Sequence, residues 1–146
     1  MAFIYYVTQI QFDFGAIQLL KQECSRVGIT RPLVVTDPGV RAAGVLQKAL
    51  DNLAGMPVTV FDQTPSNPTE AAVRAAAMYK AQGCDGLIAV GGGSAIDCAK
   101  GVAIAATHDG PLTHYATIEG GSVRITDRAA PLIAVPTTSG TGSEVA

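Results

Sequence analysis

The sequence contains no tryptophan, little charge and no long apolar run. Lys, Arg, Asp and Glu form 15% of its 146 residues, and the net charge is -2. The lack of any apolar run of about 18 residues excludes a helix that could span a membrane. The first residues also lack a basic region followed by an apolar stretch, so no export signal is predicted. We therefore expect a cytoplasmic protein without a membrane partner.

Cations, cysteines and histidines are also few. The 10 Lys and Arg residues are scattered and form no basic stripe for a phosphate backbone, which argues against a nucleic-acid partner. A zinc or iron site takes about three or four protein ligands, and His108 and His114 lack metal-site spacing. We expect Cys24, Cys84 and Cys98 to be ordinary buried or half-buried thiols.

Strand and helix patterns alternate along the chain. Hydrophobic residues form 48% of the sequence, as in a packed globular body. Short apolar runs predict strands at 33–35, 58–61, 86–90 and 131–135. Helical spacing predicts helices at 16–27, 45–53, 69–82 and 94–106. This order predicts one α/β domain over residues 1–146, a Rossmann-like, mostly parallel sheet with helices on both faces.

Two further segments have weaker patterns. Residues 3–7 and 10–14 are rich in β-branched and aromatic side chains, which predicts a hairpin at a sheet edge. Residues 109–130 show no clear period, so we expect a long loop with a small β excursion at 123–125.

The run Gly91–Lys100 leaves a buried strand through three glycines and starts a helix at once. A glycine-rich turn before a helix exposes backbone N–H groups at the positive end of the helix dipole, where a phosphate binds well. Ser94 could donate to that phosphate or could cap the helix, with Asp97 completing a capping box. The run lacks the third glycine of G-x-G-x-x-G and the Gly-Lys-Ser/Thr end of a P-loop, and the chain has no G-x-S-x-G serine-hydrolase elbow.

Two other strand ends carry polar residues. Pro136–Glu144 is dense in hydroxyl groups and glycines, and is either a flexible turn or a loop that wraps a phosphate or ribose. Asp37 could accept a hydrogen bond from a ribose 2′-OH, or could be the N-cap of a helix that starts at Pro38. Because carboxyl ends of parallel strands share one sheet edge, these loops are expected to meet the glycine turn.

Three ordered motifs resemble the iron-containing (group III) alcohol dehydrogenases. Gly91–Lys100 is similar to the family's GGGSxxDxxK, and Pro136–Glu144 is similar to its PTTxGTGSE. Ser66–Thr69 resembles its xNPT turn. The resemblance implies the dehydroquinate synthase-like N-terminal fold of that family. It covers the whole chain but only the nucleotide-binding half of the family's length.

The resemblance also implies roles for residues in these motifs. Gly92, Gly93 and Ser94 would contact the pyrophosphate of a nicotinamide dinucleotide. Asn67 and Asp97 would border the cofactor nearer the nicotinamide.

The adenosine side is implied in the same way. Thr137, Thr138 and Thr141 would line the adenine and ribose. Asp37 would favour NAD over NADP. The implied reaction is hydride transfer between the cofactor and a small alcohol or aldehyde, in a homodimer formed through the N-terminal strands.

The family holds a divalent iron or zinc ion in a helical C-terminal domain that this chain lacks. The metal would polarise the alcohol oxygen as a Lewis acid. Thr141–Glu144 has capping-box spacing, which announces a helix, so we expect the 146 residues to be the N-terminal part of a longer protein, inactive alone.

Other functions compete with this hypothesis. A maleylacetate reductase of the same family is a close alternative. A non-catalytic flavodoxin-like FMN carrier is a second, although its phosphate loop follows the first strand. A purely structural role through the N-terminal hairpin is a third.

Overall fold

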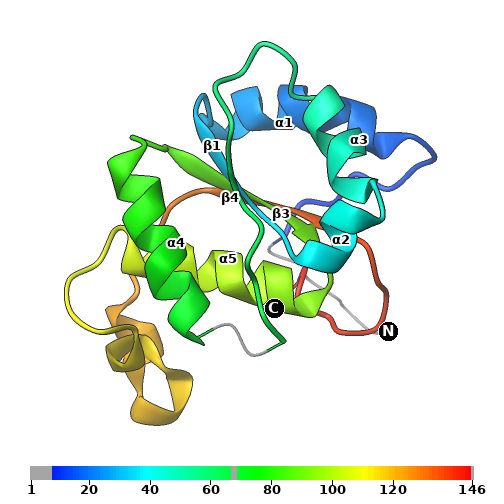
Figure 1. Cartoon of the computed structure of the whole chain (residues 1–146). Coiled ribbons are helices and arrows are strands. Elements are labelled where there is room, and N and C mark those ends of the chain that lie inside the picture. Colours follow the sequence, from blue (N-terminus) through cyan, green and yellow to red (C-terminus); the bar gives the residue numbers. More distant parts are fainter. Residues whose placement is uncertain (1–7, 67–68, 146) are drawn as a thin grey trace, which may run out of the picture.

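Four parallel strands form one sheet in the order β2-β1-β3-β4 (Figure 1). The computed structural model describes residues 8–66 and 69–145 of the chain. The strands are β1 (Pro32–Val35), β2 (Thr59–Phe61), β3 (Gly86–Gly91) and β4 (Leu132–Pro136). The predicted parallel α/β sheet is therefore confirmed, with each strand where an apolar run predicted it.

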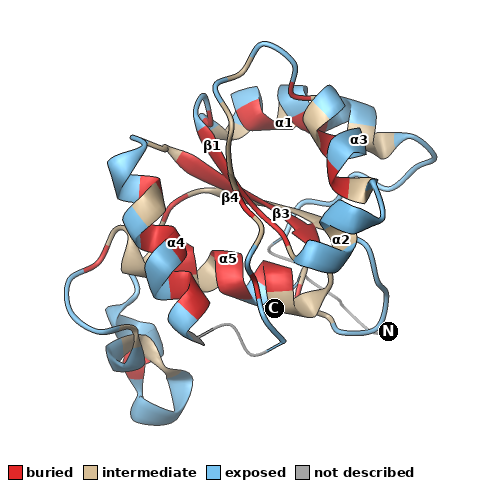
Figure 2. Cartoon of the chain, viewed as in Figure 1, coloured by how far each residue is buried: buried red, intermediate tan, exposed pale blue. Residues whose placement is uncertain are grey.

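Helices cover both faces of the sheet (Figure 1). They are α1 (Leu20–Val27), α2 (Pro38–Ala42), α3 (Val45–Asp51), α4 (Thr69–Ala81) and α5 (Gly93–Ala105). Side chains alternate along a strand, so Val34 and Ile88 pack with α1 and α3, whereas Leu33 and Leu87 pack with α4 and α5. Figure 2 shows the central strands buried between these layers. None of the helices in the described residues is long and apolar enough to cross a membrane.

The three cysteines are free thiols within these layers. Cys24 and Cys98 are buried and Cys84 is half-buried, which confirms the prediction. Burial raises the pKa of the Cys24 and Cys98 thiols. The thiols therefore stay protonated near neutral pH and behave as small apolar side chains.

The strand predicted at 10–14 is wrong. Residues 8–15 contain only two bends and a turn, and a 3₁₀ helix (Ala16–Leu19) then leads into α1. Phe12 and Phe14 are fully exposed, at 98% and 105%. A β pattern forms a strand only where another strand pairs with it, and the described residues offer none here. The other half of the predicted hairpin, residues 3–7, lies outside the described residues.

The β excursion predicted at 123–125 is also wrong. The loop after α5 folds into the 3₁₀ turns η2 (Leu112–Tyr115), η3 (Thr117–Glu119) and η4 (Gly121–Arg124). A Cβ atom on Gly121 would lie 2.4 Å from the Tyr115 carbonyl carbon, so the loop packs closely on itself instead of joining the sheet. Buried His108 fixes its far end, because its Nε2 accepts a hydrogen bond from the Thr126 N–H at 2.9 Å.

The remaining helix predictions have mixed outcomes. Gly28 ends α1 in the left-handed conformation (φ 79°), as expected. The N-cap expected at Asn67 lies outside the described residues. Thr141–Glu144, where the spacing announces a helix, overlaps a turn in which the Val145 N–H donates to the Gly142 carbonyl at 3.0 Å, and the helix itself stays a prediction.

The Asp85 carboxylate connects the starts of β1 and β3. It accepts hydrogen bonds from the Thr30 N–H at 3.0 Å and the Arg31 N–H at 2.8 Å, and a third from the Thr30 hydroxyl. Burial raises the pKa of Asp85, but these hydrogen bonds outweigh burial and hold the pKa below its ordinary value of 3.8. The charged form is therefore favoured by folding.

We predict that Asp85→Ala lowers the free energy of unfolding by about 1–2 kcal/mol at pH 7, because two backbone donors lose their acceptor. The depressed pKa gives stability that is complete above the unfolded-state value and is lost as the pH falls through the folded-state value. Urea unfolding between pH 2 and pH 7 measures this effect. The difference in free energy of unfolding between the unmodified chain and Asp85→Ala should become smaller in acid. Exposed Asp109→Ala is the control, and an equal loss there would contradict the role of Asp85.

Candidate functional site

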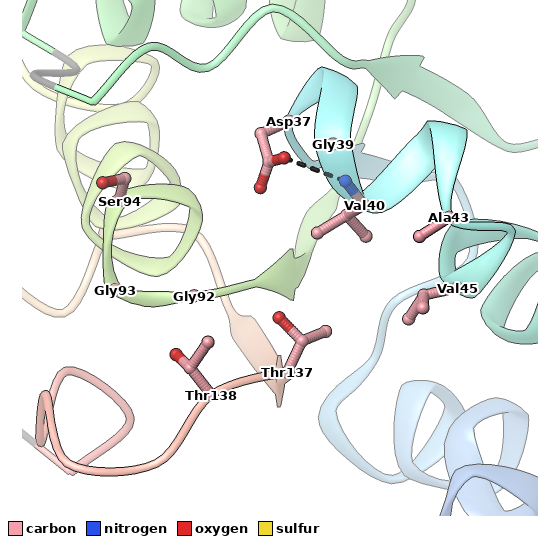
Figure 3. A pocket seen from close by; sticks show the side chains of 10 residues that line it. All are labelled: Asp37, Gly39, Val40, Ala43, Val45, Gly92, Gly93, Ser94, Thr137 and Thr138. Carbon is pink, nitrogen blue, oxygen red and sulfur yellow. Dashed lines mark hydrogen bonds between the residues drawn. The ribbon is translucent and has the colours of Figure 1, made fainter.

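The loops after β1, β3 and β4 meet at the carboxyl edge of the sheet. Strand β1 lies between β2 and β3, so the direction in which successive strands are added reverses there. In open α/β sheets, ligands bind at such a switch point. An open cleft of about 530 Å³ lies at this edge (Figure 3). Its lining residues are Asp37, Gly39, Val40, Ala43, Val45, Gly92, Gly93, Ser94, Thr137 and Thr138.

The glycines make a very short turn from β3 into α5. β3 ends at Gly91 and α5 begins at Gly93, with Gly92 as N-cap. A Cβ atom on Gly91 would lie 2.7 Å from the Cβ of Ala95, closer than such atoms approach. Only glycine at 91 therefore lets the helix start directly at the strand end.

The capping-box hypothesis for Ser94 is wrong. Ser94 lies inside the first turn of α5, and its hydroxyl donates to the Ser66 carbonyl at 3.3 Å. The N-cap Gly92 has no side chain with which to accept a hydrogen bond from the first amides. Because glycine lets the helix begin two residues earlier than Ser94 would, the positive end of α5 faces the cleft without a side-chain cap.

The hydroxyl-rich loop after β4 covers this turn. The Thr137 N–H donates to the Gly91 carbonyl at 2.9 Å. A Cβ atom on Gly92 would lie 3.1 Å from the Thr138 Oγ1, and one on Gly93 would lie 3.1 Å from the Thr141 Cγ2. Thr141 therefore contacts the glycine turn without lining the cleft. Together these contacts place neutral hydroxyl groups around the start of α5.

Asp37 has both a structural contact and a place in the cleft. Its Oδ1 accepts a hydrogen bond from the Val40 N–H at 2.9 Å, which confirms it as N-cap of α2 (Figure 3). A Cβ atom on Gly91 would lie 3.3 Å from the other carboxylate oxygen, Oδ2. One oxygen thus holds α2, and the carboxylate also lines the cleft beside the glycine turn.

Asp97 lies apart from the lining residues of the cleft. Its Oδ2 accepts a hydrogen bond from the Ser143 hydroxyl at 3.4 Å, and its Oδ1 lies 3.6 Å from the Lys100 Nζ. It therefore connects α5 to the loop after β4. Asn67 lies outside the described residues, so its predicted role stays a prediction.

An apolar wall on the cleft was not predicted from the sequence. Gly39, Val40, Ala43 and Val45 line it from α2 and the start of α3. The N-cap signal at Asp37 could have indicated this wall, because it places the first turn of α2 at the same sheet edge. The described residues that line the cleft include no Lys or Arg, and the start of α5 brings the partial positive charge of a helix N-terminus to it. Residues 8–66 and 69–145 contain no group of three or more His, Cys, Asp or Glu side chains that could hold a metal ion.

We predict that Asp37→Ala lowers the free energy of unfolding by about 1 kcal/mol, because the Val40 N–H loses its acceptor. Asp37→Asn should stay close to the unmodified chain, since asparagine is an equally good N-cap. Urea unfolding of the two variants measures the difference. Equal stability of the alanine and asparagine variants would contradict the capping role.

Comparison with known proteins agrees with this geometry. The family model described as iron-containing alcohol dehydrogenase matches residues 7–146. A 4-hydroxybutyrate dehydrogenase from Cupriavidus necator is 74% identical over 147 residues, which cover 100% of this chain and 38% of that protein. A choline dehydrogenase from Bacillus subtilis is 40% identical, over 94% of this chain and 35% of that protein.

Solved structures show the same fold. A 1,3-propanediol oxidoreductase has a TM-score of 0.79 and 41% identity, over 90% of this chain and 34% of the other. The sulfoacetaldehyde reductase from Bifidobacterium kashiwanohense, solved in complex with NAD+, has a TM-score of 0.85 and 30% identity, over 99% of this chain and 38% of the other. The chain thus spans little more than a third of the length of these relatives.

The fold and the cleft define a doubly wound α/β domain with an uncapped helix start at its switch point. The chain belongs to the iron-containing alcohol dehydrogenase family. This membership confirms the resemblance seen in the motifs and decides against the flavodoxin-like alternative.

Proposed function

We propose that the chain binds NAD, with the pyrophosphate against the first turn of α5. It would be the cofactor-binding part of a metal-containing alcohol dehydrogenase. The observation that carries the proposal is the start of α5, a helix of 13 residues that faces the cleft without a side-chain cap. The first amides of a helix lack partners inside the helix and carry partial positive charge, so they bind phosphate oxygens.

The loops around α5 support a dinucleotide in particular. Gly92 and Gly93 have no side chains, so an anion can approach the main chain closely. Ser94 also lines the cleft, and its hydroxyl would donate to the same phosphate group in place of the Ser66 carbonyl. Thr137 and Thr138 would add neutral donors on the adenosine side, with Thr141 behind them.

Asp37 supports NAD rather than NADP. A carboxylate accepts hydrogen bonds from ribose hydroxyls, whereas a 2′-phosphate beside it would place like charges together. The apolar wall formed by Val40, Ala43 and Val45 would pack against the adenosine. Asn67 and Asp97 remain proposed for the nicotinamide side.

The proposed reaction is the reversible oxidation of a small alcohol. A hydride would pass from the carbinol carbon to NAD, and the hydroxyl proton would leave, giving an aldehyde or ketone and NADH. The family implies a divalent metal that polarises the alcohol oxygen. The described residues contain no cluster of His, Cys, Asp or Glu side chains that fits such an ion, so none of them is proposed as a metal ligand. The relative at 74% identity suggests hydroxy acids among the alcohols to test first.

We predict that the purified 146-residue chain has no dehydrogenase activity, because its described residues provide a cleft for a cofactor but no metal cluster. NADH formation at 340 nm measures this with 4-hydroxybutyrate and 1,3-propanediol, with and without added Fe²⁺ or Zn²⁺. Metal-dependent turnover by this chain would contradict the prediction.

Calorimetric titration with NAD tests cofactor binding. We expect saturable binding that weakens about tenfold or more in Gly92→Val, because a Cβ atom at 92 would lie 3.1 Å from the Thr138 Oγ1, and the larger side chain would crowd Thr138 where it lines the cleft beside the start of α5. Ala77→Val, on the exposed face of α4, should bind like the unmodified chain. Failure of the unmodified chain to bind NAD, or equal binding by Gly92→Val, would contradict the proposal.

We also infer that the protein forms a homodimer through its N-terminal region. Phe12 and Phe14 are fully exposed there, which supports burial against another surface. A location in the cytoplasm remains part of the same proposal.

A further inference from the structure

An ion pair joins α2 to the end of β2 next to the cleft. The Arg41 guanidinium of α2 donates a hydrogen bond to the Asp62 carboxylate, in the residue that follows β2. Their side chains are 62% and 27% exposed, so the pair lies at the surface, where water can reach it. Arg41 lies between Val40 and Ala43, both of which line the cleft.

Backbone hydrogen bonds place Asp62 beside the start of the Asp37 loop. Val35 of β1 pairs with Phe61 of β2. The next residue along β1, Thr36, donates its N–H to the Phe61 carbonyl at 2.9 Å and accepts from the Thr64 N–H at 3.3 Å. Asp62 therefore lies next to Thr36, one residue before Asp37.

Arg41 also lies one helical turn from Asp37 along the backbone. Its backbone N–H donates to the Asp37 carbonyl at 3.1 Å. Arg41 is thus a cation whose backbone follows Asp37 by one turn, next to residues that line the cleft, and whose side chain is paired with Asp62. The ion pair with Asp62 occupies its guanidinium, which would otherwise be a good partner for a phosphate because it offers several donors in one plane.

We propose that Asp62 is a positioning residue for cofactor specificity. Its ion pair with Arg41 keeps the guanidinium from binding the 2′-phosphate of NADP. The inference rests on the proposed function, because it needs the adenosine ribose to lie beside Asp37. Asp37 would disfavour a 2′-phosphate directly by its charge. Asp62 would disfavour it indirectly, by keeping Arg41 engaged.

Removing the charge of Asp37 alone would therefore relax the preference for NAD less than removing both carboxylates. Asp37→Asn removes the charge and keeps the N-cap of α2, but Arg41 stays with Asp62. Asp62→Asn alone would release Arg41 toward the remaining Asp37 carboxylate. Only the double variant frees the guanidinium for a phosphate, so the two substitutions should act non-additively.

The test is calorimetric titration of the 146-residue chain and its variants with NAD and with NADP. The ratio of the two dissociation constants should shift toward NADP about twofold to fivefold more in Asp37→Asn/Asp62→Asn than in Asp37→Asn alone, because releasing Arg41 recovers what an exposed ion pair contributes. Adding Arg41→Ala should abolish that extra shift. High salt should reduce it, since it depends on charge.

Two controls separate specificity from general effects. Asp109→Asn removes one negative charge, as Asp62→Asn does, but at a residue beyond the far end of α5. It should therefore leave the ratio of the NAD and NADP dissociation constants unchanged. Thermal unfolding of each variant shows that the ratio is measured on folded protein. An exposed ion pair contributes little stability, so Asp62→Asn should fold.

The outcomes distinguish the two proposals. If the unmodified chain binds neither nucleotide, the proposed function fails and this inference fails with it. If NAD binds but the double variant shows no extra shift, or Arg41→Ala does not remove it, only the role of Asp62 is overturned.

Discussion

The candidate site depends on the turn between β3 and α5, where one residue separates a buried strand from a helix. This turn requires glycine at 91, because a side chain there would overlap Ala95. It also brings the first amides of α5 to the sheet edge before any polar side chain can cap them. The same short connection therefore satisfies packing and leaves a helix N-terminus without a side-chain cap at the cleft.

The buried sheet holds this turn in place. β1 and β3 are buried along their whole length, between α1 and α3 on one face and α4 and α5 on the other. Close-packed protein interiors deform little, so the loops that follow these buried strands have fixed starting points. The hydrogen bonds of Asp85 fix the opposite edge, where β1 and β3 begin. The loops at the carboxyl edge can then change in sequence and conformation while the sheet and its helices stay the same.

The elements with strong local signals were predicted from the sequence. Continuous apolar runs identified the strands because a parallel sheet is buried on both faces. The N-cap at Asp37 and the stop at Gly28 depend on residues within one turn. The N-cap predicted at Ser94 was wrong because the glycines before it start the helix earlier. The strand predicted at residues 10–14 was wrong because a β pattern forms a strand only where another strand pairs with it.

By itself, the sequence determined the alternation of strands and helices, the glycine turn and six of the ten residues that line the cleft. It did so because each of these depends on neighbours in the chain. The tertiary structure alone decided the wall that Val40 and Ala43 form and the pairing of Arg41 with Asp62. The wall needs β1 beside β3, which brings α2 to the glycine turn, and the ion pair needs β2 beside β1. Strand order is fixed by how helices pack across the whole sheet rather than by any local stretch.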